Sequence, residues 1–157
     1  RLTARIWGCS ANSLNQSKRR LHEQDVEVLA LLPVALRADL YEEVHTPVLC
    51  HHPFFAQLNT SYNSSFRVLL CKAVAERAVP QSRELFTNAE SGDGIFFVVS
   101  GTLVFTDSRP EVARTPRALP VDLEPNMWIC EPALWIQWKH VGHATAETHC
   151  ELLHMPT

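Results

Sequence analysis

The sequence lacks any hydrophobic run long enough to cross a bilayer. No stretch of 18 or more apolar residues occurs, whereas a membrane-spanning helix needs about 20. The chain also lacks a net positive charge. It contains 14 Lys and Arg and 17 Asp and Glu, which gives a formal net charge of −3. A nucleic-acid binder needs a basic surface to neutralise phosphates, so we expect no nucleic-acid partner.

Disulfide, metal and catalytic patterns are also missing. The five cysteines are odd in number, widely spaced and without a Cys-x-x-Cys pair, which argues against a disulfide framework and favours reduced thiols in a cytosolic setting. The Cys and His spacings match no zinc pattern. No Walker loop, Gly-x-Ser-x-Gly or His-Glu-x-x-His motif occurs. We therefore expect no enzyme activity, no catalytic residue and no metal site.

What is present is the composition of a globular domain. Hydrophobic residues make up 46% of the 157 residues and charged residues 20%, which is typical of a folded protein. The length fits one domain with an appendage. Because the chain begins with Arg1 and stops just after an apolar segment, we expect it to be a piece of a longer protein whose membrane segments, if any, lie upstream.

The first part of the chain carries helical patterns. Residues 23–32 begin with acids and turn apolar, as the first turns of an amphipathic helix do. A second helix is expected from Val34, with Pro47 closing it. Residues 64–72 have helical spacing too, with a serine as the cap.

From about residue 75 the pattern changes to strands and turns. Residues 95–99 are aromatic and β-branched, residues 102–106 form a second such run, and Ser100-Gly101 between them is turn chemistry. Two runs joined by such a turn predict a β-hairpin.

Further short strands follow a polar loop over residues 107–120. One is expected at Trp128-Ile129, entered through Asn126, a residue type that accepts the left-handed conformation. Residues 144–155 alternate and supply the last strands. Short strands with closely spaced turns predict a small β-roll or barrel.

Taken in order, these segments resemble the cyclic-nucleotide-binding domain family. Residues 84–86 and 90–101 resemble a conserved strand and turn of that family, residues 128–134 (Trp-Ile-Cys-Glu-Pro-Ala-Leu) resemble the opening of its phosphate-binding cassette, and residues 146–153 resemble the strand after the cassette. The resemblance covers about residues 54–157 and rests on the ordered series rather than on any single motif.

The helical part of the chain indicates which members of this family the sequence resembles most. Leu32-Pro33, residues 36–40 and residues 52–55 are similar to the end of the C-linker in hyperpolarisation-activated, cyclic-nucleotide-gated and ether-à-go-go-type channels. The fold class implied is α+β. N-terminal helices, the C-linker end, are expected over residues 1–58. A small antiparallel β-roll or jelly-roll of cyclic-nucleotide-binding type is expected over residues 59–157, truncated before its C-terminal lid helices.

The function implied by this resemblance is a cytoplasmic regulatory domain of a membrane cation channel, with potassium as the expected ion. Its partners would be neighbouring channel subunits of a tetramer, contacted through the linker helices. Its location would be the cytoplasmic side of a membrane. Two alternatives stay open: a module that senses cAMP or cGMP, such as a kinase regulatory subunit, and a structural domain of the same fold without a sensing role.

The cassette departs from the family at the positions that hold the ligand. In the family a Glu accepts the ribose hydroxyl, an Arg nine residues later pairs with the cyclic phosphate, and a Gly before the Glu lets the ligand approach. Glu131 keeps the first role, but the Arg position holds His140 and the Gly position holds Cys130, while Pro132 removes one N–H. A charge-assisted hydrogen bond contributes about 1.5–3 kcal/mol, so losing the Arg should cost roughly one to two decades of affinity.

The resemblance thus implies a set of candidate ligand contacts without a required cofactor, with cAMP or cGMP binding weakly at most. His140, mostly neutral at pH 7, is expected at the surface rather than on a phosphate. Trp128, Trp135 and Trp138 are expected to fill the core rather than to stack on a base. The candidate contacts are Ile129, Cys130, Glu131, Pro132, Ala133, Leu134, His140 and Val141.

Overall fold

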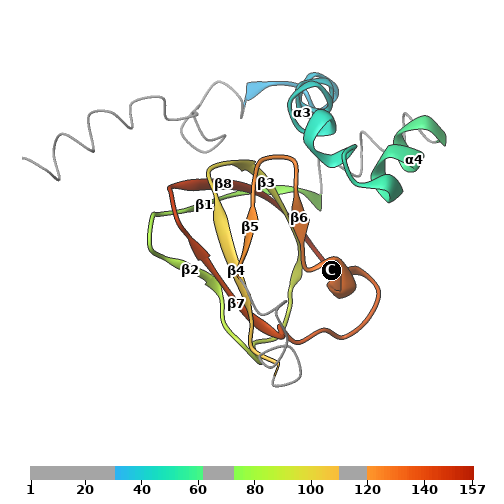
Figure 1. The fold of residues 1–157 in the computed structure, drawn as a ribbon. Coiled ribbons are helices and arrows are strands. Elements are labelled where there is room, and N and C mark those ends of the chain that lie inside the picture. The colour runs from blue at the N-terminus through green and yellow to red at the C-terminus, as the bar shows by residue number, and fades with distance from the viewer. Residues whose placement is uncertain (1–30, 62–72, 110–119) are drawn as a thin grey trace, which may run out of the picture. The chain divides into compact units, whose positions relative to one another are not determined.

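A computed structural model describes residues 31–61, 73–109 and 120–157 (Figure 1). Residues 33–157 form one compact unit, and residues 1–32 are assigned to a second. The helix predicted over residues 64–72 lies outside the described residues, as does the helix predicted over residues 23–32 except for its last two positions. Within the described part of the chain, no helix is long and apolar enough to span a membrane.

Two helices precede the strands. Helix α3 (Val34–Leu49) begins where the sequence predicts, and α4 (Pro53–Ser61) follows after a short turn. Pro47 lies inside the last turn of α3, so the prediction that it closes the helix was wrong. A proline removes only its own N–H, and the next hydrogen bonds still form: the N–H of Cys50 donates to the carbonyl of Thr46 at 2.9 Å. The division after residue 58 stays a prediction, and α4 runs across it.

The described strands form two antiparallel sheets, which confirms the predicted β-roll after N-terminal helices. The first sheet has the order β1-β8-β3-β6 and the second the order β2-β7-β4-β5 (Figure 1). The strands predicted at residues 95–99, 102–106 and 128–129 are present. The bounds are β1 (Ala75–Val79), β2 (Glu84–Phe86), β3 (Gly94–Ser100), β4 (Leu103–Asp107), β5 (Val121–Leu123), β6 (Trp128–Ile129), β7 (Gly142–Ala146) and β8 (Cys150–Pro156).

The turn at Ser100-Gly101 is a corner between the sheets, so the predicted hairpin was wrong. Strand β3 pairs with β8 and β6, whereas β4 pairs with β7 and β5. Gly101 has φ of 83°, and a Cβ there would lie 2.3 Å from the carbonyl oxygen of His149, so only glycine fits. The N–H of Thr102 donates to Oγ1 of Thr148 at 2.9 Å. Turn chemistry marks where the chain turns, but it does not determine which sheet the next strand joins.

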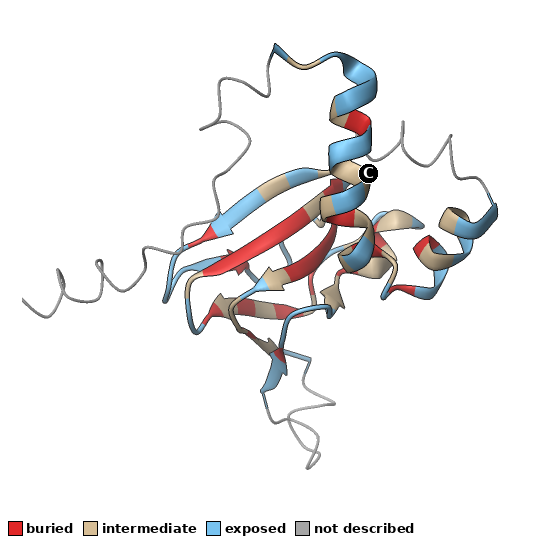
Figure 2. Cartoon of the chain, turned by 90° about the horizontal axis from the view of Figure 1, so that it is seen from above, coloured by how far each residue is buried: buried red, intermediate tan, exposed pale blue. Residues whose placement is uncertain are grey.

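The central strands of the first sheet, β3 and β8, are buried on both faces. Successive side chains of a strand point to opposite faces, and β3 sends Phe96 and Val98 into an inner cluster between the sheets. Ile95 and Phe97 belong to an outer cluster that includes Phe55 of α4. Buried residues accordingly run along the central strands, with isolated ones on the helices (Figure 2). The helices are therefore held to the β-roll by an apolar layer.

The outer cluster yields a matched pair of substitutions. Phe55 is 1% exposed and lies edge-on to Phe97, whereas its neighbour Phe54 is 39% exposed. We expect Phe55→Ala to lower the free energy of unfolding by about 3–5 kcal/mol, because it leaves a cavity, and Phe54→Ala by about 1 kcal/mol. Urea unfolding followed by circular dichroism measures both. Equal costs would contradict the packing of α4 on the first sheet.

Candidate functional site

The segment that resembles the cassette opening forms a tight turn after β6. A short 3-10 helix, η2 (Glu131–Leu134), begins there with Pro132 in its first turn. The residue before it, Cys130, has φ of 70° and ψ of 24°, a left-handed conformation that costs a non-glycine residue roughly 1–2 kcal/mol. The backbone at Cys130 thus has a conformation that glycine adopts more readily than other residues do, and the thiol that it carries is buried.

His140, at the position of the family arginine, is buried rather than at the surface. Its side chain is 4% exposed, and its ring stacks on Phe86 of β2 with centroids 3.8 Å apart and planes 11° apart. Nδ1 of His140 lies 3.5 Å from Sγ of Cys130. The backbone fixes this placement, since the N–H of His140 donates to the carbonyl of Glu90 at 2.9 Å. The expectation of a surface histidine was wrong because the ring is turned into the inner cluster.

Burial favours the neutral forms of both His140 and Cys130. Burial lowers the pKa of His140 below 6.5, although Glu90 and Asp93 act in the opposite direction. Burial, reinforced by the charge of Asp93, raises the pKa of the Cys130 thiol to about 12. Desolvation disfavours the charged form of either group. Burial therefore disfavours a charge at both of these positions of the turn.

Glu131, at the position of the ribose acceptor, faces the helices instead. Its Oε2 lies 3.4 Å from Nε2 of His52, at the start of α4, and its side chain is 45% exposed. Nδ1 of His52 accepts the N–H of Phe54 at 3.2 Å, which leaves Nε2 to face the carboxylate. The imidazole ring also contacts Trp128, with centroids 4.6 Å apart. Glu131 thus contacts His52, which packs on the outer side of the first sheet, whereas His140 contacts the inner cluster.

The remaining candidate contacts are arranged around η2. Ile129 packs against the inner cluster and Leu134 against the outer one, while Ala133 is buried. Val141 is half-buried, and its carbonyl accepts the N–H of Ser108 at 2.9 Å. The structure therefore brings Cys130 and His140 together but does not direct Glu131 toward them.

The tryptophans divide between core and surface. Trp128 packs against the outer cluster as predicted, and Trp138 is half-buried beside Gly92. Trp135 is 57% exposed, so its predicted core role was wrong. Within the described ranges, no three metal-ligating side chains come together.

Two residues that contact the site were missed from the sequence. Phe86 and His52 both belong to segments that carry the resemblance, residues 84–86 and 52–55, but no local signal links either of them to the cassette. Their partners are 54 and 79 residues away in the chain, as the numbering of His140 and Glu131 shows, and only the folded topology brings them together.

Comparison with solved structures identifies the fold. The N-terminal domain of a Streptomyces coelicolor transcriptional regulator matches with a TM-score of 0.54 and 21% identity, over 69% of this chain and 71% of that one. A Brucella abortus cyclic nucleotide-binding-like protein matches with a TM-score of 0.54 and 20% identity, over 71% and 89%. No protein-family model and no curated protein matches the sequence.

A third similar structure is the regulatory subunit of a cAMP-independent protein kinase A from Trypanosoma cruzi, solved bound to guanosine. Its TM-score is 0.57 and its identity 15%, over 76% of this chain and 40% of the subunit. At such identities the similarity establishes the fold alone. The chain has the fold of a cyclic-nucleotide-binding domain.

The lowered histidine pKa values predict a loss of stability on acidification. Burial lowers the pKa of His154 as well as that of His140, so below about pH 6.5 the unfolded chain takes up protons that the folded chain does not. The free energy of unfolding should fall by at most about 1.4 kcal/mol per pH unit for each histidine.

Urea unfolding between about pH 7.5 and about pH 5.5 measures this slope. His140→Leu should remove part of it, because one of the two groups is gone. A free energy of unfolding that rises as the pH falls would show that the buried rings gain protons on folding.

Proposed function

We propose that this chain is a non-catalytic regulatory module of the cyclic-nucleotide-binding type that acts through protein contacts and does not depend on cAMP or cGMP. The proposal is carried by one observation: the position of the phosphate anchor is occupied by His140, a buried ring whose pKa is lowered by that burial and which is stacked on Phe86. A cyclic phosphate buried there would meet the ring of His140 in place of a guanidinium, and an unpaired buried charge is costly.

The module fits a host of the kinase-regulatory-subunit type better than a channel. Domains of this fold occur in the transcriptional regulator and in the kinase regulatory subunit described above. The Trypanosoma cruzi subunit is described as cAMP-independent and was solved with guanosine, so a domain of this fold need not respond to cAMP in order to belong to a kinase regulator. The similarity is one of fold, and the host is our inference.

A cation channel remains the second candidate. It is supported by the similarity of Leu32-Pro33 and residues 52–55 to a C-linker end, and by the buried packing of α3 and α4 on the first sheet, which would let the helices transmit movement. In that setting the partners would be neighbouring subunits of a tetramer, on the cytoplasmic side of a membrane. The sequence upstream of Arg1 decides between the hosts, because a channel requires a pore loop and membrane spans there.

Calorimetric titration with cAMP and cGMP tests the proposal. We expect a Kd weaker than about 100 μM for both, since an Arg–phosphate pair and the close approach allowed by glycine are both missing. Micromolar binding of either nucleotide would overturn the proposal.

A double variant tests the physical cause. Cys130→Gly with His140→Arg restores the glycine and the guanidinium, and it should strengthen cAMP binding at least about tenfold. Lys139→Arg is the matched control, because it adds a guanidinium one residue away on an exposed side chain and should change nothing. If the control gains as much as the double variant, the two positions are not what prevents binding.

A further inference from the structure

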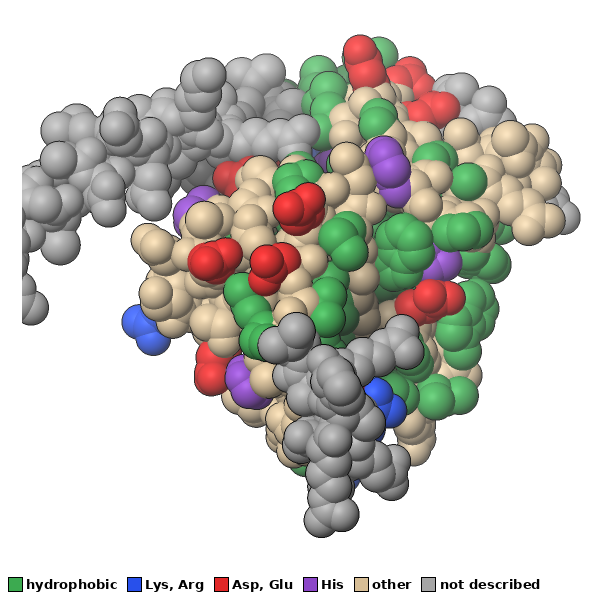
Figure 3. Space-filling model, in the orientation of Figure 1, with side chains coloured by type: hydrophobic (Ala, Val, Ile, Leu, Met, Phe, Trp, Pro, Cys, Tyr) green, Lys and Arg blue, Asp and Glu red, His purple; other side chains and the backbone are tan. Residues whose placement is uncertain are grey.

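The side chain of His52 lies where the turn of η2 meets the start of α4. It is 3% exposed, and aromatic rings from a helix and two strands surround it. These rings belong to Phe55 in α4, Phe97 in β3 and Trp128 in β6, with centroids 4.6 to 6.3 Å from that of the imidazole. Figure 3 shows hydrophobic side chains gathered on the right of the molecule, with a histidine beside an acidic side chain among them. A polar ring in such surroundings depends on specific partners for its nitrogens.

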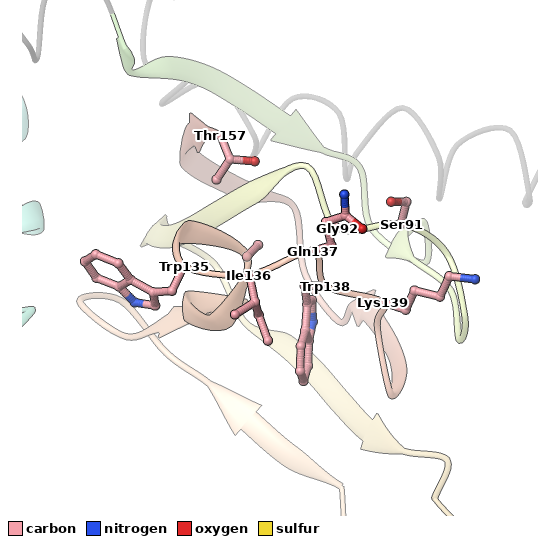
Figure 4. A pocket seen from close by; sticks show the side chains of 9 residues that line it. Ser91, Gly92, Trp135, Ile136, Gln137, Trp138, Lys139 and Thr157 are labelled. Carbon is pink, nitrogen blue, oxygen red and sulfur yellow. The ribbon is translucent and has the colours of Figure 1, made fainter.

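A hollow beside η2 does not offer a comparable convergence of groups. Trp135 and Trp138 point in different directions there, and Lys139 points away from both (Figure 4). A ligand site needs polar and apolar groups that face a common space. Polar and aromatic groups do face one another at His52.

His52 is the N-cap of α4. Its carbonyl accepts the N–H of Ala56 at 3.0 Å, which is the first hydrogen bond of the helix. Pro53 follows at the first helical position, where a missing N–H is not needed. Nδ1 of His52 accepts the N–H of Phe54 at 3.2 Å, as the side-chain oxygen of a serine or an aspartate does in other caps. The imidazole thus satisfies an N–H for which the helix itself has no acceptor.

The cap determines the tautomer of the His52 ring. Nδ1 can accept a hydrogen bond only while it carries no proton, so the proton of the neutral ring is on Nε2. Nε2 lies 3.4 Å from Oε2 of Glu131, and it is buried without a hydrogen bond among the described residues. The carboxylate of Glu131 is the charged group that faces the ring from η2, whereas the neighbours from α4, β3 and β6 are uncharged aromatic rings.

Protonation of His52 and capping of α4 exclude each other. An imidazolium has an N–H on both nitrogens and no acceptor, so the N–H of Phe54 would face another donor. The positive charge would at the same time strengthen the contact with Glu131, because a charge-assisted hydrogen bond is stronger than a neutral one. Histidine is also the side chain whose ordinary charge change falls between about pH 5 and 8.

We propose that His52 is a pH-dependent link between α4 and the turn of η2. The neutral ring caps the helix, whereas the protonated ring releases the first turn of α4 and binds Glu131 instead. Acidification thus loosens the start of a helix that Phe55 still holds to the first sheet. This link goes beyond the proposed function, because it does not depend on whether a nucleotide or a protein contact controls the domain.

Amide hydrogen exchange of Phe54, measured by NMR between about pH 7.5 and about pH 5, tests the link. The protection factor of this amide corrects for the intrinsic pH dependence of exchange. It should fall about fivefold as the ring of His52 is protonated, since that is the contribution of a typical cap. The Cε1 signal of the ring, assigned with His52→Asn, follows the protonation in the same sample.

Two adjacent histidines provide the variant and its control. His52→Asn introduces a side-chain oxygen that caps at every pH, so the protection of Phe54 should no longer depend on pH. His51→Gln removes an exposed ring whose Nδ1 lies 2.7 Å from the carbonyl oxygen of Pro47, and Phe54 should still respond as in the wild type. Glu131→Gln should move the loss of protection to lower pH, because the charge that favours a protonated ring is gone.

Four results would overturn the proposal. They are a His52 ring that stays neutral down to about pH 5, a Phe54 amide whose protection does not follow the ring, an unchanged pH response in His52→Asn, and a response that disappears in His51→Gln. His52→Ser, whose hydroxyl also caps a helix, takes the place of the Asn variant if that variant does not fold.

Discussion

The imidazole of His140 lies flat on the ring of Phe86, inside the layer between the two sheets. This contact removes the water that would solvate a protonated ring, and desolvation favours the neutral form. The thiol of Cys130 beside it also stays neutral, because burial keeps its proton in place. A cyclic phosphate requires the opposite environment, a cation that faces a solvated cavity. The same buried contact therefore extends the core of the β-roll, and in the function that we propose it stands in place of an anchor for the cyclic phosphate.

On its other face the first sheet carries the helices. Ile95 and Phe97 of β3 meet the apolar side of α4, and His52 at the start of that helix meets Glu131. The carboxylate of Glu131, which could accept a ribose hydroxyl, instead contacts the residue that immediately precedes α4. The cassette turn is thus tied on one side to the inner cluster and on the other to α4. The turn therefore connects the inner cluster to α4. The exposed side chain of Trp135 is available for a further contact.

Much of the fold could be predicted from the sequence, and the predictions that were wrong failed for physical reasons. The run at residues 95–99 and the left-handed Asn126 were read correctly, because local conformation reflects local chemistry. The hairpin at Gly101 was wrong, because the pairing of β3 and β4 depends on the whole topology. We predicted His140 at the surface because histidine is polar. Its stack on Phe86 could not be predicted, because it joins segments that are far apart in the chain. Trp135 was placed in the core because its size suggested burial. The contact between His52 and Glu131 had no sequence signal at all.

The protonation of His140 can be measured directly. A proton–carbon correlation spectrum of the chain, recorded through a pH titration and assigned with His140→Leu, follows the Cε1 signal of that imidazole. We predict a pKa below 6.5 that is unchanged by the addition of cAMP. A pKa above that value, or one that rises when cAMP is added, would mean that a cationic His140 still faces a phosphate site, and would contradict the account of this domain.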